Sequence, residues 1–254
     1  MPLSNHQAKQ KPAYGWDASG VMVGFLVAGS VILVAALLVL RVQPFALATP
    51  VAVALILIGM VPTILGLAML QYGLVGKLRT RDALIGLIDW RGDEAVLDVG
   101  TGAGTLLIAA AKRLDRGGRA TGIDIWSAKD LSNNSSAATL RNSAIEGVAD
   151  RVDVQTGDAT ALTFADASFD IVVSLLCLHN IEPKPDQVRA CAEIARVLKP
   201  GGRVVIGDYV PTHDYAAALR SAGLRIERSR SAFAIAGALM WILVADKPLA
   251  QDAP

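Results

Sequence analysis

Residues 18–76 contain a single charged side chain, that of Arg41, although the rest of the chain is charged at ordinary density. The first uncharged stretch, Val21 to Leu40, has 20 residues, and a helix of that length spans about 30 Å, the thickness of a bilayer's hydrocarbon core. The second stretch runs from about Thr49 to Leu74 and has Pro62 in its middle, where we expect a kink. The two stretches predict a two-helix transmembrane hairpin.

A cleaved signal peptide and a pair of buried core helices are the alternatives to a membrane hairpin. A signal peptide has a shorter apolar region followed by ordinary sequence, whereas here a second apolar segment follows the first. Lys9 and Lys11 precede the hairpin, and Lys77, Arg79 and Arg81 follow it. By the positive-inside rule both ends are cytoplasmic. We therefore expect a multi-pass protein of the cell membrane, with the remainder of the chain in the cytoplasm.

From Thr80 onward, helix-like and strand-like segments alternate, which is the pattern of an α/β fold with a doubly wound, mostly parallel sheet. We expect strands at residues 95–99, 120–125, 152–156, 169–175 and 203–207, and helices at residues 105–114, 135–146 and 186–198. Two further strand-like runs, at residues 224–230 and 239–245, have no helix-length segment between them. They predict an antiparallel hairpin at the sheet edge.

The changes in composition divide the chain into four parts. We expect a cytoplasmic tail over residues 1–20, the hairpin over residues 21–76, a folded domain over residues 77–247 and a C-terminal tail over residues 248–254, with the first 15 and last seven residues loose. A net charge of +1 and the lack of a basic stripe argue against a nucleic-acid partner. Cys177 and Cys191 have neither disulfide-framework nor zinc-site spacing. We expect them to be buried thiols, and we expect no metal.

The stretch VLDVGTGAGT is a strand followed by a glycine-rich turn, which lets backbone N–H groups approach a ligand. A dinucleotide fingerprint reads G-x-G-x-x-G, but here the glycines are Gly100, Gly102 and Gly104, and Thr105 stands where the third glycine is expected. Asp98, at the end of the strand, would repel a pyrophosphate and attract an ammonium group. The pattern therefore favours a ligand with a cationic end.

S-adenosylmethionine has a cationic amino-acid end and a nucleoside end. Asp124 ends the second strand in GIDIW, where a carboxylate can accept hydrogen bonds from both ribose hydroxyls. Asp158 ends the third strand in TGDAT, where it can accept from an adenine amino group. FDIVVSLLCLHNI then provides the fourth strand, and RVLKPGGRVVIGDY a helix end, a turn and the fifth strand.

In this order, VLDVGTGAGT, GIDIW, GDA, FDIVVS and LKPGG resemble the class I S-adenosylmethionine-dependent methyltransferases over about residues 78–248. The resemblance implies a seven-stranded Rossmann-like sheet with a terminal antiparallel hairpin, S-adenosyl-L-methionine as cofactor, and methyl transfer. The small-molecule and lipid branch, which includes quinone and sterol methyltransferases, is the most similar. The implied cofactor-binding residues are Asp98, Gly100, Thr101, Gly102, Gly104, Asp124, Ile125, Asp158, Ala159 and Ser174.

His179 is the candidate catalytic residue, because it lies just past the fourth strand, on the rim where a methyl acceptor is expected. An imidazole there can take a proton from an acceptor hydroxyl or thiol. The alternative is a histidine that orders its loop through a backbone hydrogen bond. Asp208, Tyr209 and His213, after the fifth strand, are equally well placed by position.

The loop WSAKDLSNNSS after the second strand is long and polar. Trp126 could pack on the adenine, and Asn133 and Asn134 could reach a ligand. For the two asparagines we favour a surface loop that ends in a helix cap at Ser135 or Ser136.

The sequence therefore predicts a membrane-anchored methyltransferase with a small-molecule or lipid/quinone-like acceptor. The hairpin would keep the active-site rim near the bilayer, or would recruit the enzyme to a membrane partner. The alternative is a non-catalytic, membrane-tethered sensor of S-adenosylmethionine or a scaffold, which would be expected to have decayed cofactor motifs. A dinucleotide-dependent enzyme is disfavoured by the charge and spacing of the glycine turn.

Overall fold

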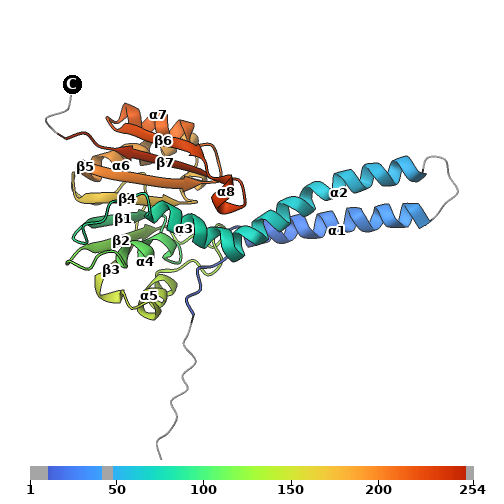
Figure 1. Cartoon of the computed structure of the whole chain (residues 1–254), viewed down its shortest axis with the longest axis horizontal. Coiled ribbons are helices and arrows are strands. Elements are labelled where there is room, and N and C mark those ends of the chain that lie inside the picture. The colour runs from blue at the N-terminus through green and yellow to red at the C-terminus, as the bar shows by residue number, and fades with distance from the viewer. Residues whose placement is uncertain (1–10, 42–47, 250–254) are drawn as a thin grey trace, which may run out of the picture.

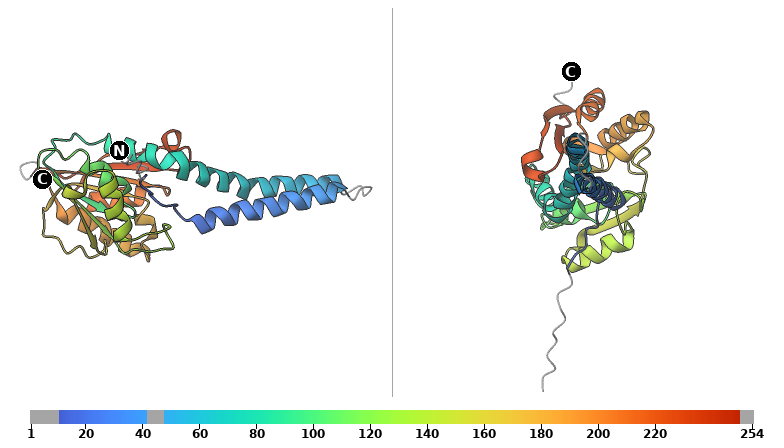
Figure 2. Two further views of the ribbon diagram at one scale, coloured as in Figure 1. Left: turned by 90° about the horizontal axis from the view of Figure 1, so that it is seen from below. Right: turned by 90° about the vertical axis from the view of Figure 1, so that its right-hand side faces the viewer.

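The computed structural model describes residues 11–41 and 48–249, and it has two parts, a pair of long helices and an α/β domain (Figure 1). The pair projects from one edge of the domain, as the views in Figure 2 also show. Lys9, the turn expected after Arg41 and residues 250–254 of the expected C-terminal tail lie outside the described residues.

Helices α1 (Ser19–Arg41) and α2 (Ala48–Gln71) lie side by side as a hairpin (Figure 1). Glycine lets the two backbones approach: a Cβ on Gly29 would collide with Thr63 Oγ1. By length and composition both helices can cross a membrane. Only 11% and 17% of their most apolar windows are buried, whereas core helices of a soluble domain would be mostly buried.

Helix α2 continues through Pro62 as one helix. It continues through a π-helical turn, η1 (Tyr72–Gly76), into α3 (Lys77–Ile85). Together these form one helical stretch of 38 residues, Ala48–Ile85. The second apolar helix is therefore continuous with the first helix of the domain.

The domain is built on a seven-stranded sheet of order β3-β2-β1-β4-β5-β7-β6. The strands are β1 (Ala95–Val99), β2 (Arg119–Asp124), β3 (Val152–Thr156), β4 (Phe169–Leu175), β5 (Leu198–Asp208), β6 (Arg225–Ser231) and β7 (Trp241–Asp246). The first five are parallel, and β7 pairs antiparallel with both β5 and β6. This confirms the expected mostly parallel sheet with an antiparallel hairpin at its edge.

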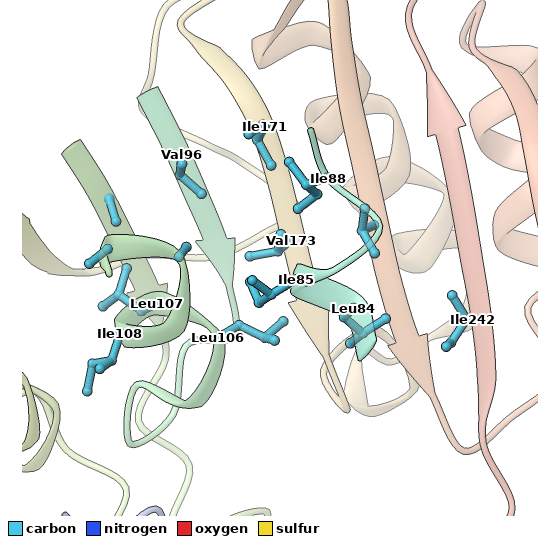
Figure 3. Close-up of a cluster of buried hydrophobic side chains, with 14 of the residues drawn as sticks. Leu84, Ile85, Ile88, Val96, Leu106, Leu107, Ile108, Ile171, Val173 and Ile242 are labelled. Atoms are coloured by element: carbon cyan, nitrogen blue, oxygen red, sulfur yellow. The ribbon is translucent and has the colours of Figure 1, made fainter. Parts of the chain in front are cut away.

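Helices cover both faces of this sheet. They are α4 (Thr105–Ala111), α5 (Ser136–Ile145), α6 (Lys184–Val197), α7 (His213–Ser221) and the short α8 (Phe233–Ala236), with 3-10 turns η2 (Ala149–Arg151) and η3 (Leu178–Asn180). On one face, Ile85 of α3 lies over Val173 of β4, and Leu84 lies towards β5 (Figure 3). The other face packs against α6 and α7. Because α3 belongs to the core, the hairpin is joined to the domain through buried contacts.

Residues 13–17, called the strap below, lie across the domain. The Ala13 N–H donates to Asn142 Oδ1 over 3.0 Å, and Asn142 Nδ2 donates back to the Ala13 carbonyl over 2.9 Å. Trp16 exchanges hydrogen bonds with Ser132, and Asp17 forms a β-bridge with Leu131. The expectation of a loose start is therefore wrong for this segment.

Candidate active site

A cavity of about 280 Å³ opens at the carboxyl ends of β1, β2, β3 and β4. Parallel strands of a doubly wound sheet place ligand sites at this edge. Eight of the implied cofactor-binding residues line it: Asp98, Gly100, Thr101, Gly102, Asp124, Ile125, Asp158 and Ala159. Gly104, Ser174 and His179 are not among the lining residues of the described chain.

The glycine turn forms the floor of this cleft. Gly100, Gly102 and Gly104 have φ angles of 74°, 54° and 88°, in the left-handed region that favours glycine. A Cβ on Gly100 would collide with the sulfur of Cys177, so only a glycine fits there. Gly104 instead ends the turn at the N-cap of α4. Its role in the structure is to start that helix.

Asp98 lies fully buried beneath the turn. Its Oδ2 accepts hydrogen bonds of 2.9 Å from Thr101 Oγ1 and from the Leu107 N–H. Burial raises the pKa of this carboxyl group to about 7, although the two hydrogen bonds oppose the rise. A cationic group bound in the cleft would favour the charged carboxylate. The site is therefore suited to a ligand with a positive end.

Asp124 is held at the end of β2 by three donors. The Gly102 N–H donates to its Oδ2 over 2.9 Å, and the Trp126 N–H and Asn134 Nδ2 donate to its Oδ1 over 2.6 and 3.1 Å. Asn134 Oδ1 is buried and has no hydrogen-bond partner among the described residues. It lines the cleft as an acceptor that a ligand's hydroxyl or amino group can satisfy.

The structure corrects the interpretation of the loop after β2. Asn134 lines the cleft and is not a residue of a surface loop. Trp126 turns its indole N–H to Thr156 Oγ1, 2.8 Å away, and is not among the residues found to line the cleft. Ser135 is the N-cap of α5, as expected, because its side chain accepts from the Ala138 N–H. Sequence position alone could not tell Asn134 from Asn133, which is exposed.

Asp158 and Ser174 differ in how they relate to the cleft. Thr160 donates to Asp158 Oδ1 from both its N–H and its hydroxyl, each over 2.8 Å, and Asp158 lines the cleft. The Ser174 hydroxyl is buried and donates to the Val99 carbonyl over 2.8 Å. It therefore ties β4 to β1 within the sheet. This contact gives Ser174 a structural role.

Cys177 is half-buried and lines the cleft, so the expectation of a core thiol is wrong for it. Burial raises the pKa of its thiol strongly. Cys191 is fully buried, as expected, and burial raises its pKa to about 12. Both thiols are therefore protonated at neutral pH, and neither is primed as a nucleophile.

His179 lies in η3, beyond β4, and pairs with the buried Asp208 at the end of β5. His179 Nδ1 is 2.7 Å from Asp208 Oδ1, and the His179 N–H donates to Asp208 Oδ2 over 3.3 Å. The Tyr209 N–H and the Tyr215 hydroxyl also donate to this carboxylate, and the Tyr209 ring packs edge-on against the imidazole. His213 is 75% exposed and pairs with Asp214 instead. His179 thus lies in the chain between Cys177 and Asn180, which line the cleft, although it is not itself among the described lining residues.

The two ends of the hairpin meet at the cleft. Asp17 precedes α1, Lys77 begins α3, and both line the cleft. Lys77 Nζ lies 2.8 Å from Asp17 Oδ2 and donates to the carbonyls of Tyr14 and Gly15 over 3.1 and 3.3 Å. In the sequence, Lys77 indicates only the topology of the hairpin. No local pattern pairs Lys77 with Asp17, an acid 60 residues earlier.

Comparison with known proteins shows that the domain is similar to methyltransferases. Residues 97–206 match the family profile described as a methyltransferase domain. The chain is 36% identical over 132 residues to a 27-O-demethylrifamycin SV methyltransferase of Amycolatopsis mediterranei, covering 52% of this chain and 44% of that protein. It is 41% identical over 110 residues to a demethylmenaquinone methyltransferase of Lactiplantibacillus plantarum, covering 43% of each. The matched segment thus spans less than half of each relative.

Among solved structures, a SAM-dependent methyltransferase from Aquifex aeolicus aligns with a TM-score of 0.53 and 20% identity, over 65% of this chain and 87% of that one. At this identity the likeness concerns the fold alone, and the fold is the one described above. The profile match over residues 97–206 and the observed sheet order both agree with the class I methyltransferase fold expected from the sequence.

Proposed function

We propose that the protein is a membrane-anchored methyltransferase that moves the methyl group of S-adenosylmethionine to a small acceptor of the lipid or quinone class. The observation that carries this proposal is that Asp17 and Lys77, which flank the apolar hairpin, also line the cleft. A reaction in this cleft would take place where the hairpin meets the domain. The hairpin lies in the cell membrane and the domain in the cytoplasm, in keeping with the charges after α2.

The cleft offers the donors and acceptors that S-adenosylmethionine requires. Asp98 and the glycine turn would hold its cationic amino-acid end, Asp124 and Asn134 its ribose, and Asp158 its adenine. When bound, it supplies a methyl group on an already activated sulfonium. The protein's task is then to align the acceptor and to exclude water, because proximity and orientation supply much of the acceleration in an in-line displacement.

His179 is the proposed base for an acceptor that carries a proton. Asp208 accepts from Nδ1, which leaves Nε2 as the acceptor nitrogen of the neutral ring. The relatives named above methylate a rifamycin and a demethylmenaquinone. An acceptor of similar apolar, ring-bearing chemistry would reach the rim from the bilayer, where it would be concentrated.

The test begins with the full-length protein in its native lipid, incubated with methyl-labelled S-adenosylmethionine and whole-cell extract. The products are partitioned between organic and aqueous phases, and S-adenosylhomocysteine is quantified. Label in the organic phase supports a lipid-class acceptor, and mass spectrometry identifies it. Label only in water points to a polar acceptor and reduces the hairpin to a tether. Cofactor binding without turnover favours a sensor.

A further inference from the structure

Helix α8 and the turn after it, residues 233–239, lie at the edge of the domain from which the hairpin projects (Figure 1). They are fixed against the hairpin's end: a Cβ on Gly76 would collide with the Ala236 carbonyl oxygen, and one on Gly237 would lie 2.7 Å from Gln71 Oε1. Ala236 and Met240 are buried beneath. The segment therefore has a defined position next to the second apolar helix.

The outer side of this segment is apolar and exposed. Phe233 and Leu239 are 57% and 59% exposed. Across the contact with η1 and α3, Leu74 is 61% exposed, Val75 41% and Leu78 37%. These five residues are called the interfacial patch below. An exposed apolar group of this kind, continuous with an apolar helix, needs a partner that is itself apolar.

Positive charge borders the interfacial patch. Strand β6 leads directly into α8, and its Arg228 and Arg230 have no ion-pair partner among the described residues; neither has Arg79 of α3. Arg196, by contrast, pairs with Glu193 and Asp166. Unpaired arginines next to apolar side chains match the headgroup region of an anionic leaflet, where basic residues are attracted to acidic lipids.

We propose that the interfacial patch, with Arg79, Arg228 and Arg230, is a second membrane contact that docks on the surface of a bilayer containing anionic lipid. This inference rests on the proposed membrane hairpin. The hairpin alone would fix the domain at one point. A second contact beside it would hold the carboxyl edge of the sheet, and with it the cleft, against the headgroups.

The test uses full-length protein in nanodiscs whose lipids carry brominated acyl chains, which quench nearby tryptophans. Phe233→Trp adds a reporter to the interfacial patch. Leu249→Trp adds one at the opposite edge of the sheet, where the native side chain is 55% exposed. The fluorescence of each added tryptophan is obtained by subtracting the emission of the wild-type protein, which has four tryptophans of its own. We expect the signal of the Phe233→Trp reporter to fall at least twofold in phosphatidylcholine/phosphatidylglycerol discs, and that of the Leu249→Trp reporter to be unchanged. Equal quenching at both positions overturns the inference.

The role of charge is tested with the double substitution Arg228→Gln/Arg230→Gln in the protein that carries the reporter at position 233. In discs that contain phosphatidylglycerol, we expect its quenching to fall to the value measured in discs of phosphatidylcholine alone. Arg225→Gln, at the other end of the same strand, is the matched control and should change nothing. Leu239→Trp repeats the test if Phe233→Trp does not fold. Co-elution with discs reports on the hairpin separately. Protein that co-elutes without quenching at position 233 overturns only the docking surface, whereas protein that fails to co-elute overturns the membrane anchor as well.

Discussion

The imidazole of His179, beyond the end of β4, and the carboxylate of Asp208, the last residue of the neighbouring β5, lie 2.7 Å apart, Nδ1 to Oδ1. Asp208 is fully buried and accepts hydrogen bonds from two further groups, so its position is fixed. The contact explains how a histidine beside the cleft keeps one orientation. The His179 backbone N–H donates to the same carboxylate, so Asp208 also holds the loop that carries the histidine.

A kinetic test separates these two roles. If His179 acts as the base, His179→Ala lowers kcat by about 100-fold with an acceptor that carries a proton, while the Kd for S-adenosylmethionine is unchanged. Asp208→Asn lowers kcat less and alters its pH profile, because the amide does not hold the Nδ1–H tautomer as well. His213→Ala, at an exposed position, is the control. Retention of wild-type kcat in His179→Ala would show that alignment alone is sufficient.

Asp98 should make the stability of the ligand-free protein depend on pH. Its folded-state pKa is about 7, raised by burial from 3.8. Between these values the folded state holds the proton more tightly than the unfolded state does, so stability is lost as pH rises toward 7. Asp98→Asn is expected to flatten this dependence and to raise Tm at pH 8, as measured by scanning calorimetry of the ligand-free protein. A Tm profile identical to wild type would contradict the assignment.

The same substitution should weaken cofactor binding. The carboxylate is charged above pH 7, and a cationic ligand benefits from that charge. We expect wild-type affinity for S-adenosylmethionine to increase from pH 6 to pH 8, and Asp98→Asn to bind about tenfold more weakly at pH 8 with little dependence on pH. Isothermal titration calorimetry gives both values. Equal affinities for the two proteins at pH 8 would exclude a charge role for Asp98.

Asn134 should contribute to ligand affinity more than to folding. Its Oδ1 has no partner in the ligand-free cleft, so Asn134→Ala loses only the bonds from Nδ2 to Asp124 and to the Ser127 carbonyl before ligand binds. We expect a roughly five- to tenfold higher Kd for S-adenosylmethionine, about the value of one hydrogen bond. Asn133→Gly, at the exposed neighbour with a positive φ of 58°, should leave Kd unchanged. Similar Kd values for both variants would argue against a ligand contact.

The ion pair between Asp17 and Lys77 should hold the strap in place. Lys77 is buried and Asp17 is 26% exposed, so Lys77→Met leaves a partly solvated carboxylate without its partner, which is expected to cost about 1–3 kcal/mol. Hydrogen–deuterium exchange should then rise in residues 13–17 and in the loop they contact. Lys184→Met, in a pair that is more than half exposed on both sides, should have little effect. Unchanged exchange in the strap would contradict the coupling.

The local periodicity of the sequence was enough to predict most of the sheet. The bounds of β1 and β4 were predicted as observed, because each is a short, mostly apolar run flanked by turn residues. Strand β5 begins earlier than expected, at Leu198, because Leu198 already pairs with Phe169 of β4, ahead of an irregularity in the register. Helix α7 was not predicted, because its nine residues are too short a window for the helical period to stand out.

The sequence predicted those residues of the candidate site that belong to short motifs at the ends of strands. The glycine turn, Asp124 and Asp158 follow from strand ends, and their convergence on one cleft follows from parallel pairing. Ser174 was misplaced because alternation along a strand decides which way a side chain points. Contacts between distant segments, such as the strap on Asn142 and Leu131, leave no periodic signal in the sequence.

The Asp17–Lys77 contact also has a consequence for biogenesis. The chain leaves the domain at Asp17 and returns at Lys77, so in topological terms the hairpin is an insertion within the folded unit and not a leader in front of it. The strap is synthesised first but docks on residues made after the hairpin. If the hairpin spans the bilayer, a nascent chain that threads only one helix leaves strap and domain on opposite sides of it. Correct threading is then a precondition for completing the active site.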